Sequence, residues 1–161
     1  MSEAPSMPIS EFLVPEHVLV DLAAPSKQSV LEALATKAAA WSGVGAQPIF
    51  TALSNREQLG STGVGQGIAI PHATVAGLAA PLGLLARLAR PVDFDAIDEG
   101  KVDIVFVLLI PATDRAAALK LLSTAARILR SEETRALIRA APDAGALYEA
   151  ISEAYDTQFP G

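Results

Sequence analysis

The stretch Val102-Asp-Ile-Val-Phe-Val-Leu-Leu-Ile110 is apolar at every position but Asp103 and is rich in β-branched residues. A run of this kind predicts a strand that is buried on both faces of a sheet. A second strand is predicted over Leu82 to Leu88, and a turn-rich connection joins the two segments. Because no helix separates them, we expect these strands to pair antiparallel.

Toward the N-terminus, strand and helix signals alternate. Val18 to Leu22 predicts a first strand. Ser26 is placed to cap a helix that Gly43 closes, and we expect Trp41 of that helix to pack against the sheet. A second helix is expected over residues 48–60.

Beyond the apolar run, the pattern is helical to the end of the chain. Thr113 or Asp114 is expected to cap a first helix. Its core-facing residues are predicted to be Ala118, Leu122, Ala125 and Leu129. A short helix over residues 132–140 follows, and Pro142-Asp143 begins a last one.

Together these elements predict a single α/β domain, which suits a chain of 161 residues. The expected order is β-α-α-β-β-β-α-α-α, with a mixed β-sheet flanked by helices on both faces. We expect the domain to cover residues 9–155. Residues 1–8 are expected to form a flexible N-terminus, and residues 156–161 a C-terminal tail.

Composition excludes several classes of function. The formal net charge is −6 and no Lys/Arg cluster is visible, which argues against nucleic acid as a partner. The absence of cysteine excludes thiolate catalysis, disulfides and thiolate zinc sites. With only His17 and His72, a multi-histidine metal site is excluded too, and no cofactor is expected. No secretory signal or membrane span is visible, so the expected location is cytoplasmic.

A glycine-rich loop carries the clearest chemical signal. Gly60-Ser-Thr-Gly-Val-Gly-Gln-Gly67 precedes a short strand that Pro71 is expected to terminate. The loop lacks the lysine of a P-loop and leads into a strand rather than a helix, so neither common nucleotide-binding motif fits. Its glycines can aim several backbone N–H groups into one small space, which suits an anion.

His72 follows this loop directly, and its residue context leaves three interpretations open. It is a hydrogen-bonded structural histidine, a triad member with Ser54 or Ser61, or a nucleophile that forms a phosphoramidate. No nucleophile-elbow pattern supports the triad. The other histidine, His17, is expected to be a solvated residue at a strand entry. Three aspartates are expected to be turn formers, namely Asp93, Asp95 and Asp98.

The motif Glu57-x6-Val64-Gly65-x2-Ile68-Ala69-Ile70-Pro71-His72-Ala73 resembles the signature of enzyme IIA of the mannitol/fructose class in the phosphoenolpyruvate-dependent phosphotransferase system. The segment Asn55 to Gly65 is similar to the same family. Phe94-Asp-Ala-Ile-Asp98 with Val102-Asp103 resembles its nitrogen-regulatory branch. The resemblance runs from about Ile9 to the end of the chain.

The resemblance implies a phosphotransferase component with a phosphohistidine intermediate. It implies that His72 accepts a phosphoryl group from a histidine-containing phosphocarrier protein, and that Arg56 lies close to the phosphorylated imidazole. The expected phosphate-binding loop comprises Ser61, Thr62, Gly63, Gly65 and Gly67. The protein would then regulate target proteins according to its phosphorylation state, which requires neither a metal nor membrane insertion.

One position departs from the family pattern. The family places a second histidine early in the helix after the apolar strand, and Ala118 takes its place here, with Lys120 two residues on. Two other functions therefore stay open at the level of sequence. One is a sugar-specific enzyme IIA that feeds a mannitol- or fructose-type permease, and the other is an interaction module that is not phosphorylated. The sequence indicates neither the regulated target nor the oligomeric state.

Overall fold

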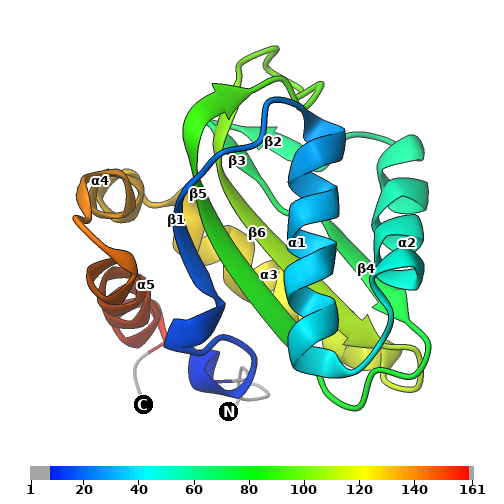
Figure 1. Ribbon diagram of the computed structural model, residues 1–161. Coiled ribbons are helices and arrows are strands. Elements are labelled where there is room, and N and C mark those ends of the chain that lie inside the picture. The colour runs from blue at the N-terminus through cyan, green and yellow to red at the C-terminus, as the bar shows by residue number, and fades with distance from the viewer. Residues whose placement is uncertain (1–7, 160–161) are drawn as a thin grey trace.

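The computed structural model describes residues 8–159, which form a mixed sheet between two layers of helices (Figure 1). The strands are β1 (Val18–Leu22), β2 (Gly63–Gly65), β3 (Ile68–Ala69), β4 (His72–Val75), β5 (Leu82–Val92) and β6 (Val102–Pro111). The helices are α1 (Lys27–Ser42), α2 (Ala46–Gln58), α3 (Arg115–Arg130), α4 (Glu132–Ala140) and α5 (Ala144–Gln158), and two short 3-10 helices precede β1 at Ile9–Glu11 and Pro15–His17. The predicted α/β fold class is confirmed. Apart from Pro8, the expected flexible N-terminus lies outside the described residues.

The sheet is built around β6. Its strand order is β1-β5-β6-β3-β2, and β4 also pairs with β6. β5 and β6 are antiparallel, as predicted, whereas β1 runs parallel to β5 and both β3 and β4 run parallel to β6. β3 and β4 lie one after the other along the same edge of β6, with Ile68 opposite Ile104 and His72 opposite Leu108. Pro71 therefore interrupts the pairing, and the chain resumes as a strand at His72 instead of leaving the sheet.

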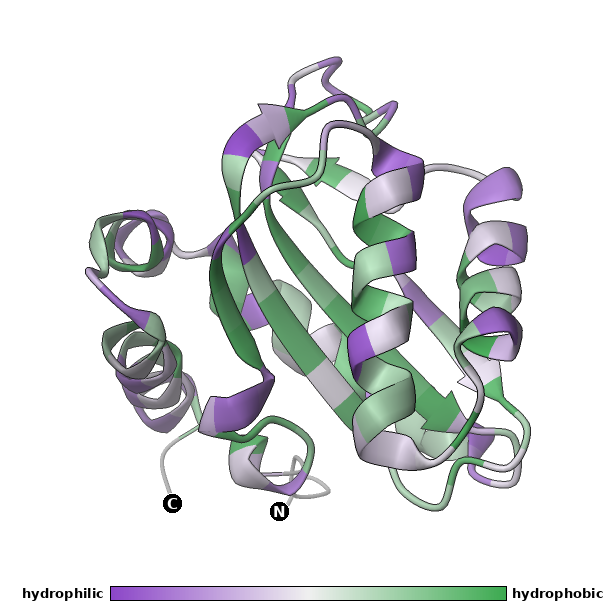
Figure 2. Ribbon diagram, in the orientation of Figure 1, coloured by the Kyte–Doolittle hydropathy of each residue, from purple (hydrophilic) through white to green (hydrophobic). Residues whose placement is uncertain are grey.

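Each face of the sheet carries its own hydrophobic core. Helices α1 and α2 cover one face, and α3, α4 and α5 cover the other (Figure 1). Along β6, side chains alternate between the two cores, so that Phe106 and Leu108 face α3 while Val107 and Leu109 face α1 and α2. Burial on both faces explains the nearly unbroken apolar sequence of β6, which is green along most of its length in Figure 2.

Short polar side chains cap α1 and α5 where the sequence predicts, whereas Asp114 stands at the start of α3 without a side-chain capping hydrogen bond. The Ser26 hydroxyl accepts a hydrogen bond from the Ser29 amide, and Gly43 ends α1 with a φ of 80°. Asp143 accepts from the Ala146 amide at the start of α5. That helix continues to Gln158, three residues beyond the domain end expected from the sequence. None of the helices in residues 8–159 is long and apolar enough to cross a lipid bilayer.

The core-facing side of α3 agrees with the prediction at Ala125 and Leu129 and differs from it at Ala118 and Leu122. The buried residues of α3 are Ala117, Leu121, Thr124, Ala125, Ile128 and Leu129. Ala118 and Leu122 are only partly buried, because the helix presents the neighbouring stripe to the sheet. The buried stripe of α3 includes the polar Thr124, so the apolar pattern of the sequence did not indicate this stripe.

Trp41 and His17 also lie differently from the expectation. Trp41 is 38% exposed and stacks on the His17 ring, with 4.0 Å between ring centroids, rather than packing against the sheet. His17 is therefore half-buried, not solvated. The contact depends on the 3-10 turn before β1, which brings His17 beside the last turn of α1.

Candidate functional site

His72 occupies the first position of β4, where both ring nitrogens have partners. Nδ1 lies 2.8 Å from the carbonyl oxygen of Ile70, and Nε2 lies 3.2 Å from Nε of Arg56. The arginine can only donate, so Nε2 must accept and Nδ1 must carry the proton. The two contacts assign the same tautomer, in which the Nε2 lone pair points toward Arg56.

Arg56 reaches His72 from the last turn of α2, which packs beside β4 (Figure 1). Its Nη1 donates to the carbonyl oxygen of Gly60 at 2.9 Å, and this anchors the guanidinium against the start of the glycine loop. Burial lowers the pKa of His72 below 6.5, and the positive charge of Arg56 lowers this pKa further. His72 is therefore neutral at pH 7, as a nucleophilic imidazole must be.

A cavity of about 350 Å³ opens beside the ring of His72. Ser61, Thr62 and Val64 line it from the glycine loop, together with Arg56 and Ile70. The opposite wall comes from α3, through Leu119, Leu122, Ser123 and Ala126. This wall could not be predicted from the sequence, because no local pattern marks which face of a helix approaches a loop more than 50 residues away.

The hydroxyls of the glycine loop are bonded within the protein. Ser61 donates to the carbonyl oxygen of Phe94 and accepts from the Gly63 amide at 2.9 Å. The hydroxyl and amide of Thr62 both donate to the carboxylate of Glu57. These bonds fix the path of the loop past His72.

Glu57 is the centre of a network of hydrogen bonds and an ion pair. In the sequence it was visible only as the first residue of the family motif. The Glu57 side chain is 5% exposed, and its carboxylate lies 2.7 Å from Nζ of Lys27. Lys27 also donates to the carbonyl oxygen of Phe94, the same oxygen that Ser61 contacts. The network thereby joins α1, α2 and the glycine loop directly behind the cavity.

Three of the glycines named in the sequence analysis do not line the His72 cavity. A Cβ at Gly63 would stand 2.8 Å from Cβ of Ala96, so glycine is needed there for close packing. Gly65 and Gly67 have φ values of +98° and +80° and form the turn between β2 and β3. The structure thus brings Arg56, Ser61, Thr62 and His72 together around one cavity and places these three glycines in its support.

The remaining candidates lie at the margin of the site. Ala118 is partly buried and is not part of the cavity wall, which begins on α3 with Leu119. Asp98 accepts from the amides of Gly100 and Gln66, which lower its pKa and tie the connection before β6 to the β2–β3 turn. Within residues 8–159, no three His, Cys, Asp or Glu side chains are grouped to hold a metal ion.

Comparison with known proteins identifies the family of this chain. Residues 11–154 match the family model for the phosphoenolpyruvate-dependent sugar phosphotransferase system, EIIA 2. The chain is 42% identical over 146 residues to a nitrogen regulatory protein of Bradyrhizobium diazoefficiens, covering 91% of this chain and 95% of that protein. It is 40% identical over 151 residues to the nitrogen regulatory protein of Pseudomonas aeruginosa, covering 93% and 98%.

Among solved structures, the nitrogen regulatory protein IIA-Ntr from Neisseria meningitidis superposes with a TM-score of 0.84 at 32% identity. The match covers 89% of this chain and 98% of that one. The sequence resemblance, the fold and the relatives agree, and the chain belongs to the EIIA 2 family of the phosphoenolpyruvate-dependent sugar phosphotransferase system.

Proposed function

We propose that this protein accepts a phosphoryl group on Nε2 of His72 from a histidine-containing phosphocarrier protein and regulates target proteins according to its phosphorylation state. The observation that carries the proposal is the fixed tautomer of His72. The carbonyl oxygen of Ile70 accepts a hydrogen bond from Nδ1–H, and this leaves an Nε2 lone pair directed toward a cationic guanidinium. The similarity to nitrogen regulatory proteins supports the regulatory part of the proposal.

The transfer uses His72, Arg56 and the backbone carbonyl of Ile70. The lone pair of His72 Nε2 attacks phosphorus, the N–P bond of the donor phosphohistidine breaks, and its electron pair returns to the donor imidazole. His72 keeps its Nδ1 proton, and the Ile70 carbonyl stabilises the positive charge that the ring acquires. Arg56 exchanges its contact with Nε2 for the phosphoryl oxygens, which a guanidinium can hold in pairs.

The surface around the cavity supports state-dependent binding of targets. Leu119 and Val64 line the cavity and are 76% and 57% exposed. A phosphoryl group on His72 adds up to about two negative charges beside these apolar side chains. A target that packs on Leu119 and Val64 therefore meets a different surface in each state.

Radiolabelled phosphoenolpyruvate with the general phosphotransferase proteins tests the acceptor. We expect label on the wild-type chain and on His17→Ala, and none on His72→Ala, whose circular dichroism should remain that of the wild type. The label should be acid-labile, as a phosphoramidate is. Label that persists on His72→Ala, or no label on the wild-type chain, would overturn the assignment, and the second result would favour the unphosphorylated interaction module.

A further inference from the structure

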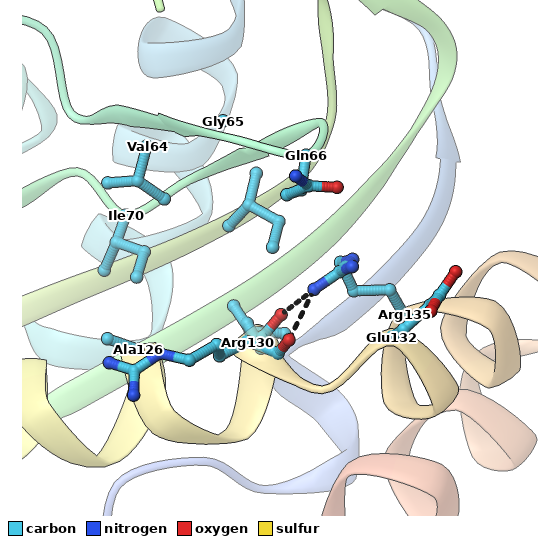
Figure 3. Close-up of a pocket in the computed structure, with 10 residues that line it drawn as sticks. Val64, Gly65, Gln66, Ile70, Ala126, Arg130, Glu132 and Arg135 are labelled. Carbon is cyan, nitrogen blue, oxygen red and sulfur yellow. Dashed lines mark hydrogen bonds between the residues drawn. The ribbon is translucent and has the colours of Figure 1, made fainter. Parts of the chain in front are cut away.

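A second cavity, of about 620 Å³, lies beside the His72 cavity. It opens between the β2–β3 hairpin and the junction of α3 with α4, with Val64, Ile70 and Gln66 on one side and Ala126, Arg130 and Arg135 on the other (Figure 3). The two cavities share the lining residues Val64, Ile70 and Ala126. The larger one has the size of a small-molecule site, and the proposed phosphoryl transfer does not use it.

Arg135 gives this cavity its chemistry. The residue is only 8% exposed, and its Nη1 donates to the carbonyl oxygens of Leu129 and Arg130 at 3.0 and 2.7 Å. Of the carboxylates in residues 8–159, none lies within 4.0 Å of the nitrogens of Arg135 or Arg130. Nε and Nη2 make no hydrogen bond within residues 8–159 and are accessible to solvent, so both keep donors to bind an anion.

The rest of the lining indicates what kind of anion fits. Arg130 extends along α3 toward Ala126, so a second guanidinium borders the cavity (Figure 3). Glu132 is the one acidic residue in the wall, and the local charge is therefore positive in a chain of net charge −6. The other walls are largely apolar, through Val64, Ile68, Ile70 and Leu129.

We propose that this cavity binds a small organic anion, with its carboxylate or phosphate on Arg135 and Arg130 and its apolar part against Ile68, Ile70 and Leu129. Since the two cavities share a wall, the anion lies close to a phosphoryl group on His72. Negative charges in neighbouring cavities repel each other, so anion binding and phosphorylation oppose each other. This second consequence rests on the proposed function, whereas binding to the unphosphorylated chain does not.

Nuclear magnetic resonance of the 15N-labelled full chain tests the binding at constant ionic strength. The probes are acetate, hexanoate, hexyl phosphate and inorganic phosphate. We expect saturable shifts for amides in residues 64–70 and 126–135, tighter binding of hexanoate or hexyl phosphate than of acetate or phosphate, and the same binding to His72→Ala. The relative affinity of the two hexyl probes shows which anionic group the arginines prefer.

Two substitutions locate the site. Arg130→Gln changes an exposed residue and should fold normally, and Arg135→Lys keeps the charge but loses the planar fork. Each substitution should weaken the binding of hexanoate or hexyl phosphate about 10-fold, which corresponds to the loss of one charge-assisted hydrogen bond. The control Arg127→Gln should bind as the wild type does, because Arg127 stands over the Phe159 ring and outside this cavity.

Three results would overturn the proposal. These are the absence of saturable shifts with every probe, unchanged affinity in Arg130→Gln, and loss of binding in His72→Ala. The last would show that the anion occupies the phosphoryl site itself.

Discussion

The protonation of His72 is decided by its immediate surroundings and can be measured directly. Burial and Arg56 lower its pKa, so we expect its ring to titrate below 6.5 in a nuclear magnetic resonance titration. Phosphoryl uptake should accordingly persist as pH falls to 6.5 and decline only below that value, where the lone pair is lost. Arg56→Gln should raise the midpoint. The chain has two histidines, so His17→Gln leaves the His72 signal alone in the spectrum. A midpoint at or above 6.5 would contradict the geometry.

Arg56 is expected to act through the shape of its guanidinium as well as its charge. Arg56→Lys keeps the charge but cannot hold Gly60 and the phosphoryl oxygens at once. We expect phosphoryl transfer from the phosphocarrier protein to slow by about 10-fold or more, the effect of losing one charge-assisted hydrogen bond in the transition state. The measurement is rapid-quench transfer kinetics, with Arg90→Lys as an exposed control on β5. Equal rates in the two variants would remove Arg56 from the mechanism.

At the scale of elements, Glu57 on α2 holds the loop past His72 through its bonds from the amide and hydroxyl of Thr62. Glu57→Gln removes the charge that pairs with Lys27 and weakens both bonds from Thr62. Because Lys27 is then left with the exposed carboxylate of Asp95, 3.5 Å away, as its ion-pair partner, we expect a loss of roughly 1–3 kcal/mol in the free energy of unfolding. Urea denaturation measures it, and Lys27→Met in the same chain should recover part of the loss. A loss below about 0.5 kcal/mol would show that the pair is not structural.

At the scale of the whole molecule, the sheet separates two cores that should respond independently. Ile49 on α2 and Ile128 on α3 are both fully buried, one in each core. Ile49→Val and Ile128→Val should each cost about 0.5–1.5 kcal/mol, and the double variant should equal their sum within about 0.5 kcal/mol. Urea unfolding of the three variants tests this. A larger coupling energy would mean that the sheet transmits strain from one face to the other.

The sequence by itself determined the features that neighbouring residues encode. The apolar runs of β5 and β6, the caps at Ser26 and Asp143, and the αL end of α1 at Gly43 all follow from local propensity, and the structure confirms them. The glycine loop that leads to His72 could be predicted for the same reason, since its signal is contiguous in the chain.

Only the tertiary structure decided which distant segments meet. β4, with the sequence His-Ala-Thr-Val, has no strand pattern of its own and exists because it pairs with β6. The cavity wall of α3 depends on how that helix is rotated against the sheet, and the polar Thr124 in the buried stripe made this rotation hard to predict from the sequence. Local propensity selects a helix or a strand, but several faces of α3 could bury similar apolar area. Packing against the sheet determines which face is buried, and this orientation of α3 places Ser123 and Leu122 opposite His72.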